Sequence, residues 1–241
     1  MITESYTIDL LTREWTINNL LSLGVVWMLW SIAKRLNQSQ LAQMLMGMSV
    51  VLFLGFVYQN AYFIAHGSWN LQENLPFHLC GLSSLICMAF PLLKNKQPWF
   101  AFVFYTGILG GFQSLFTPQM NHYDGHLPLY LLYYVDHLSI IVMPLLMYAF
   151  QKRELPRFSW FRAFLNLNLL TVIIMPLNYL LDANYLYLNR PPDVDNPFII
   201  GEWPYYIFNL ELVVLVLTFG LYFLVKTLPE LLGLQKNKFY H

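Results

Sequence analysis

The chain has 241 residues, of which 57% are hydrophobic, 17% aromatic and 11% charged. Soluble domains carry about 25% charged residues, so this surface is too poor in charge to face water on all sides. The apolar content excludes intrinsic disorder. Equal numbers of acidic and basic residues, 13 of each, leave no basic face for nucleic acid. The composition indicates an integral membrane protein.

Seven apolar stretches are long enough to be membrane-spanning helices, which need about 20 residues to cross ~30 Å of hydrocarbon. In chain order they are Trp15–Ala33, Leu41–Ala65, Pro76–Leu93, Trp99–Thr117, Leu127–Phe150, Trp160–Leu181 and Trp203–Lys226. The strands of a β-barrel would be ~10 residues long with alternating polarity, which excludes that fold. The longest gap, residues 182–202, is far shorter than the ~50 residues of a further domain. We therefore predict an all-α, seven-helix bundle in which residues 1–241 form a single transmembrane domain.

Basic residues gather in alternate connections between the predicted spans. Of the 13 Lys and Arg residues, all except Arg13 and Arg190 lie beside or after the first, third, fifth and seventh spans. Lys and Arg accumulate on cytoplasmic loops, and Trp residues such as Trp15 and Trp203 at the span ends are typical of interfacial aromatic belts. We predict a multi-pass protein of the cell membrane, with its N-terminus outside and its C-terminus in the cytoplasm.

Polar residues inside the spans are costly in lipid and usually mark a functional site. The ionisable ones are His78, Asp136, His137 and Glu211, and the neutral ones include Asn60, Cys80, Ser83, Ser84, Gln113, Thr117, Asn178 and Asn209. In the orientation above, most of them fall in the outer half of the membrane. We predict a polar cavity that opens to the outer face or outer leaflet. The alternative is that these groups only form hydrogen bonds between helices.

Cys80 is the candidate nucleophile. It follows Asn74-Leu75-Pro76, which favours a helix start because Asn is a good N-cap and Pro suits the first turn. The partial positive charge of a helix N-terminus stabilises a thiolate. Cys87 lies about 10 Å further along the same helix, beyond disulfide reach, so both are expected to be free thiols. The alternative is that Cys80 is a small apolar residue of the core.

His137, in the fifth span, is the candidate base for this thiol. His78 is closer in sequence, but it lies about 200° around the helix from the cysteine and cannot easily face it. Covalent catalysis also needs a group that orients the base. Asp136 is about 100° around the helix from His137, so Gln113 or Glu211 is the predicted orienting group.

Other motifs give weaker signals. The tract His122-Tyr-Asp-Gly-His126 resembles a metal-binding sequence, but it lacks helical periodicity and its alternative is a solvated loop. An intramembrane metal held by His78, His137 and Glu211 is a further alternative. The chain has no P-loop, HExxH or dinucleotide fingerprint, and the last span has no mid-membrane lysine for retinal. We expect neither a metal nor a cofactor.

The last outer connection contains Arg190, the one base among several acidic residues. An arginine binds a lipid phosphate with two parallel hydrogen bonds. The alternative is an ion pair with Asp193 or Asp195. The residues assigned to substrate binding are His78, Asn178, Arg190 and Glu211.

Three segments together resemble the YwaF family of bacterial integral membrane proteins. They are Leu75-Pro76-Phe77-His78-Leu79-Cys80, the run Gly110–Pro118, and the stretch from Asn184-Tyr185 through Asn189-Arg190-Pro191-Pro192 and Gly201-Glu202-Trp203-Pro204-Tyr205-Tyr206 to Glu211. The family is similar to a vertebrate transmembrane protein described as a cysteine-dependent acyltransferase that builds polyunsaturated ether phospholipids. The resemblance implies that Cys80 accepts the acyl group, that His137 is the base, and that the protein lies in a bacterial plasma membrane. Bacteria seldom make such lipids, so the substrate does not transfer.

The first hypothesis is a membrane-embedded enzyme that modifies lipids by acyl transfer. Cys80 would attack an acyl ester, His137 would take the proton, and Gln113 or backbone N–H groups near residues 74–78 would hold the oxyanion. Its partners are membrane lipids and not nucleic acid, and no protein partner is assigned.

Two other classes remain open. A transporter or small-molecule-binding protein would use His78, His137 and Glu211 as a midplane site or proton relay. The third class is a structural or sensor subunit with a fixed partner.

Overall fold

The computed structural model of the chain describes residues 5–121, 123–193 and 197–232, and its regular secondary structure is almost entirely helical. The expected all-α class is confirmed. The α-helices are α1 (Arg13–Ala33), α2 (Gln38–Ala65), α3 (Leu79–Ala89), α4 (Lys96–Phe116), α5 (Leu127–Ala149), α6 (Ser159–Leu181), α7 (Tyr205–Tyr222) and α8 (Leu228–Leu231). The shorter elements are the 3-10 turns η1 (Phe90–Leu92) and η2 (Tyr185–Tyr187), the π-helix η3 (Phe223–Thr227), and the strands β1 (Tyr6–Thr7) and β2 (Gln119–Met120).

Within the described residues, six helices are long and apolar enough to cross a membrane. They are Arg13–Ala33, Gln38–Ala65, Lys96–Phe116, Leu127–Ala149, Ser159–Leu181 and Tyr205–Leu231. The remaining expected span, Pro76–Leu93, is a shorter apolar helix over Leu79–Leu92. At 1.5 Å per residue it reaches about 20 Å, less than the ~30 Å of a hydrocarbon core.

This helix is short because its start differs from the prediction. The expected N-cap, Asn74, instead accepts a hydrogen bond from the Asn70 backbone N–H at 2.7 Å, which closes a turn before the helix. Helix α3 begins after His78, whose backbone is extended. The prediction that Asn74 caps the helix is therefore wrong, because the asparagine is used in the preceding turn.

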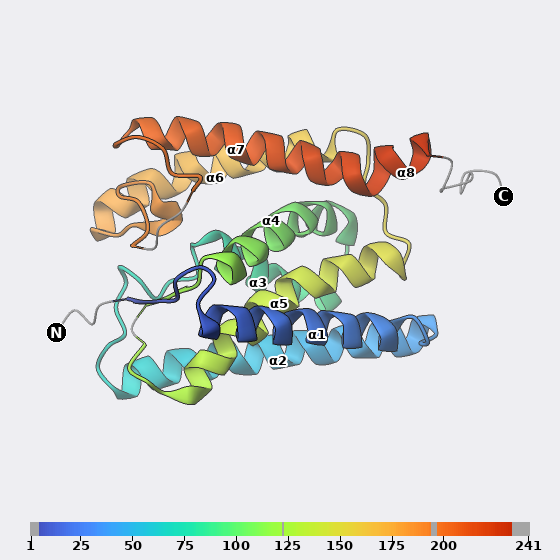
Figure 1. Ribbon diagram of the computed structural model, residues 1–241, viewed down its shortest axis with the longest axis horizontal. Helices are drawn as coiled ribbons and strands as arrows, with labels where there is room; N and C mark the ends of the chain where they lie inside the picture. Colours follow the sequence, from blue (N-terminus) through green and yellow to red (C-terminus); the bar gives the residue numbers. More distant parts are fainter. Residues whose placement is uncertain (1–4, 122, 194–196, 233–241) are drawn as a thin grey trace.

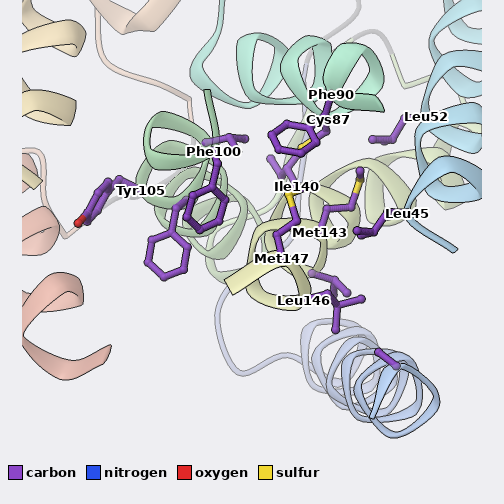
Figure 2. Packing of buried hydrophobic residues seen from close by; sticks show 14 of the residues in the cluster. Leu45, Leu52, Cys87, Phe90, Phe100, Tyr105, Ile140, Met143, Leu146 and Met147 are labelled. Carbon is purple, nitrogen blue, oxygen red and sulfur yellow. The ribbon is translucent and has the colours of Figure 1, made fainter. Parts of the chain in front are cut away.

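Helices α3, α4 and α5 form the centre of the bundle (Figure 1). α4 packs against α3 and α5, α1 and α2 pack against α5, and α6 and α7 pack on each other and against α4. The main buried cluster lies where α2 to α5 meet. Figure 2 shows its side chains from these four helices, including Leu45, Leu52, Cys87, Phe100, Ile140, Met143 and Met147.

Large apolar side chains cover the outer surfaces of the peripheral helices. Trp27 on α1 is 73% exposed, and Tyr179 and Leu180 on α6 are 86% and 77% exposed. Soluble monomers rarely carry continuous apolar surfaces of this extent. The surface is the one expected of helices that face lipid, so the protein is a multi-pass membrane protein.

Gly107 and Gly111, four residues apart on α4, bring α4 and α5 into close contact. A Cβ at Gly107 would lie 2.4 Å from the carbonyl oxygen of Ile140, and one at Gly111 would lie 2.8 Å from the carbonyl oxygen of His137. Small residues at this spacing are typical of helix interfaces in membranes, because they let two backbones approach. The contact fixes the backbone of His137 relative to α4.

Residues 5–12 cross the end of the bundle at which α1 begins, which we call the N-terminal end. β1 pairs antiparallel with β2, with Tyr6 opposite Met120. The Ser5 hydroxyl donates to the Asp193 carboxylate at 2.8 Å. The N-terminal segment therefore holds together the α4–α5 connection and the α6–α7 connection, a pairing that hydropathy alone does not indicate.

Candidate functional site

A cavity of about 540 Å³ lies between the central helices and α2, α6 and α7. Its volume falls in the range of about 300–1,000 Å³ that is usual for small-molecule sites. Connections of the N-terminal end also contribute to its wall. Most of the wall is apolar, and the polar side chains that line it include His78, Cys80, Ser84, Gln113, Ser114, Asp136, His137 and Glu211.

Cys80 lies in the first turn of α3 and lines this cavity. Its Sγ atom is 3.2 Å from the Ser114 hydroxyl of α4. The Cys80 side chain also interacts electrostatically with the His137 imidazole of α5, which lines the same cavity. The cavity thus brings together a thiol, a hydroxyl and an imidazole from three helices.

The position of the imidazole is set by its own helix. Nδ1 of His137 is 2.6 Å from the carbonyl oxygen of Tyr133, one turn earlier on α5. A carbonyl oxygen only accepts hydrogen bonds, so Nδ1 carries the proton. In the neutral ring, Nε2 is then left as the atom that can accept a proton from the thiol.

The orienting group is therefore the Tyr133 carbonyl, not the predicted Gln113 or Glu211. The Gln113 amide donates to the Thr117 hydroxyl at 2.7 Å, and Glu211 accepts a hydrogen bond from Asn168 of α6 at 2.8 Å. Both residues still line the cavity. The predicted orienting groups were chosen among polar side chains, whereas the partner of Nδ1 is a backbone carbonyl one turn earlier on the same helix.

His78 also reaches the cavity, where it lies directly before α3. Its ring centroid is 5.3 Å from that of Tyr185 and 5.0 Å from that of Tyr187. These two tyrosines belong to η2, in the connection between α6 and α7. Burial, with smaller effects from Cys80 and Asp193, raises the pKa of Tyr187 to about 12, so this hydroxyl stays protonated near neutral pH.

Asn178 and Arg190 lie outside the cavity wall. The Asn178 side chain is fully buried, donates to the Tyr185 carbonyl at 2.8 Å and accepts from the Tyr185 N–H at 2.9 Å. This pair of bonds clamps η2 onto the end of α6. The Arg190 backbone is held by Asn184, and Asp193 accepts hydrogen bonds from Ser5 and Gln119. Asp195, the other suggested partner of Arg190, lies outside the described residues.

The suggested metal-binding tract shows a different set of contacts. His122 lies outside the described residues, whereas the Nε2 atom of His126 is 2.7 Å from the Tyr58 hydroxyl of α2. The His126 ring also stacks on Tyr62 with centroids 4.4 Å apart. In the part of the chain that the structure describes, no three His, Cys, Asp or Glu residues are grouped to hold a metal ion.

Three residues near the thiol were not predicted from the sequence. Ser114 contacts the Cys80 sulfur, and its carbonyl accepts a hydrogen bond from the Tyr133 hydroxyl at 2.7 Å. Tyr187 approaches from η2 and interacts electrostatically with Cys80. The spacing of four between Tyr133 and His137 is a sequence signal for a shared helical face. No sequence signal brings Tyr187 to the site, because it depends on how η2 folds back.

The fold and the cavity define a multi-pass helical membrane protein with a thiol–imidazole pair inside it. Residues 10–222 match the model of the TMEM164 family. The chain belongs to this family of membrane proteins. No curated protein matches the chain, and no solved structure does either.

Proposed function

We propose that the protein is a membrane-embedded lipid-modifying enzyme that transfers acyl groups through Cys80, with His137 as the general base. The observation that carries the proposal is that these two side chains line one cavity and interact electrostatically there. The Tyr133 carbonyl supports the role of the base because it leaves Nε2 free to take a proton. Nucleophile, base and orienting acceptor are then all present.

The reaction proceeds in two halves. Nε2 of His137 takes the thiol proton, and the sulfur of Cys80 attacks the carbonyl carbon of an acyl ester. The ester C–O bond breaks, the proton passes to the departing alcohol, and a thioester remains on the sulfur. A second alcohol then gives its proton to His137 and attacks the thioester. The C–S bond breaks, the new ester is released, and His137 returns the proton to the Cys80 sulfur, which restores the thiol.

The first turn of α3 supplies an oxyanion site. The first N–H groups of a helix have no acceptor within the helix, and they lie at its N-terminus, which is the positive end of the helix dipole and favours negative charge. Cys80 lies in this turn, so the oxygen of a carbonyl under attack would meet these donors. Gln113 is the second candidate donor, and it would have to leave its contact with Thr117.

Membrane lipids are the proposed substrates, because the walls of the cavity are mainly apolar and the bundle faces lipid. We further propose that the short α3 is a seventh membrane-embedded helix. The bundle would then form one transmembrane domain over the whole chain, with its N-terminus outside and its C-terminus in the cytoplasm. The basic residues of alternate connections support this orientation. The resemblance to the YwaF family supports a bacterial plasma membrane. His78 and Glu211, which line the cavity, are the proposed substrate-binding residues. Asn178 and Arg190 lie outside its wall and are proposed to support it.

A second candidate function is transport or binding of a small molecule or lipid. Glu211 favours it, because a carboxyl group of α7 lines the cavity and accepts a hydrogen bond from the neutral Asn168 side chain. Ionisable residues in this position often mark a substrate or proton pathway. In this function Glu211 would be essential and the thiol would not.

The test compares two cysteines of the same helix. Purified protein is placed in vesicles of phosphatidylcholine with a radiolabelled acyl chain, together with a lysophospholipid acceptor. We expect parent protein and the Cys87→Ala control to form labelled product and a hydroxylamine-sensitive acyl adduct, since Cys87 is fully buried in the core. Cys80→Ala should form neither. Full activity of Cys80→Ala would refute acyl transfer through this thiol, and loss of lipid binding only in Glu211→Gln would favour the second function.

A further inference from the structure

Two pairs of interacting side chains join neighbouring positions of α3 and α5. Cys80 and Ser84 are four residues apart on α3 and therefore share a face. Their partners, His137 and Asp136, are adjacent on α5: Cys80 interacts with His137, and the Ser84 hydroxyl donates a hydrogen bond to the Asp136 carboxylate. All four line the cavity. The thiol–imidazole pair thus has a hydroxyl–carboxylate pair beside it.

Asp136 is a carboxyl group inside a membrane bundle, where an ionised group requires a partner of opposite charge. Among the residues that the structure describes, the titratable side chains that interact with it are His137 and Cys87. Cys87 is a buried thiol and offers no positive charge, so the imidazole is the group that can supply one. His137 in turn interacts with Cys80 and Asp136, and its Nδ1 atom is on the Tyr133 carbonyl.

This arrangement differs from a catalytic triad in which the acid binds Nδ1. Here the backbone carbonyl of Tyr133 occupies Nδ1, and the Asp136 carboxylate interacts with the ring electrostatically. A carboxylate in this place acts by charge. It stabilises the imidazolium that forms when Nε2 takes the thiol proton, and a low-dielectric site strengthens such an effect.

We propose that Asp136, held by Ser84, is a positioning residue that provides the counter-charge for the His137 imidazolium and so promotes the thiolate of Cys80. The inference rests on the proposed function of Cys80 and His137. In the step concerned, the S–H bond of Cys80 breaks and an Nε2–H bond forms on His137, while Asp136 stays ionised. Ser84 holds the carboxylate in place and exchanges no proton.

Alkylation of Cys80 by iodoacetamide tests this without any lipid substrate, because the thiolate is the reacting form. The background is Cys87→Ala, so that only one thiol remains. The rate is measured from pH 5 to pH 10 in the intact protein. We expect Asp136→Asn to lower the rate at pH 7 by about tenfold and to move the pH profile upward by about one unit. Ser84→Ala should shift it less in the same direction, and Asp136→Glu should restore part of the rate.

A His137→Gln variant separates the two proposals. If it slows alkylation while Asp136→Asn and Ser84→Ala do not, the base is supported and the counter-charge is refuted. If His137→Gln leaves the rate unchanged, the proposed function itself fails. If Asp136→Asn does not fold, Ser84→Ala decides: an upward shift of its profile supports the counter-charge, and an unchanged profile overturns it.

Discussion

Replacing Gly107 by alanine should destabilise the protein by about 2 kcal/mol. The added Cβ would lie 2.4 Å from the carbonyl oxygen of Ile140, which is backbone and cannot rotate away. Overpacking costs about 1–3 kcal/mol, and the upper value applies because α4 and α5 must move apart. Alanine gains about 1 kcal/mol over glycine in helix propensity, which leaves the net loss.

Thermal unfolding of the purified protein in detergent measures this loss. For a chain of this length 1 kcal/mol corresponds to about 2–4 °C, so the midpoint should fall by about 4–8 °C. Gly110→Ala is the matched control on the same helix, because its Cβ would be 3.4 Å from the Cys80 sulfur, an ordinary contact. Gly47→Ala, with nothing within 4 Å, is a second control. Both should melt at or above the parent midpoint. A Gly107→Ala protein that melts with these controls would refute the close α4–α5 contact.

Three further predictions concern other parts of the structure. Asn178→Ala should lower the unfolding free energy by about 2–4 kcal/mol, because it leaves two buried backbone groups of Tyr185 without partners; a midpoint equal to that of the parent in a thermal melt would contradict the clamp. Mass spectrometry after brief maleimide treatment should find Cys80 modified and Cys87 intact, since Cys80 lines the cavity and Cys87 is fully buried; equal modification would show that the core is open. The hydrogen bond that the Tyr62 hydroxyl of α2 donates to Asp124 lowers the pKa of this carboxyl group below its ordinary 3.8. The contact therefore stabilises the fold above about pH 4 and is lost as the pH falls through the lowered pKa. Melting curves from pH 3 to pH 7 should show this loss in the parent and not in Asp124→Asn.

Several features of the site could be read from the sequence because they depend on local spacing. The ionisable residues in apolar runs, Cys80 near a helix start, and His137 at mid-helix are all visible as polar exceptions in a hydrophobic pattern. The start of the third apolar helix was missed. Both Asn74 and His78 precede it. Because the Asn74 side chain accepts a hydrogen bond from the Asn70 N–H in the preceding turn, His78 is the residue directly before the helix.

The role of Asn178 shows the same limit. As a polar residue inside a span it reads as a substrate contact, yet in the folded chain both ends of its amide bind the backbone of Tyr185. A side-chain amide satisfies a buried backbone group as readily as it binds a ligand. The choice between the two depends on a loop that folds back over the end of α6.

By itself the sequence determined the helical class, the membrane setting and most of the helix ranges, because hydropathy and helix length are summed along neighbouring residues. Only the tertiary structure decided which polar groups meet. The Cys80–His137 contact, the Ser84–Asp136 pair and the approach of Tyr187 join segments far apart in the chain. Such contacts depend on how α3, α4 and α5 are rotated and how closely they pack. The glycines at positions 107 and 111 allow α4 and α5 to pack that closely. A hydropathy pattern does not describe the distance between two helices.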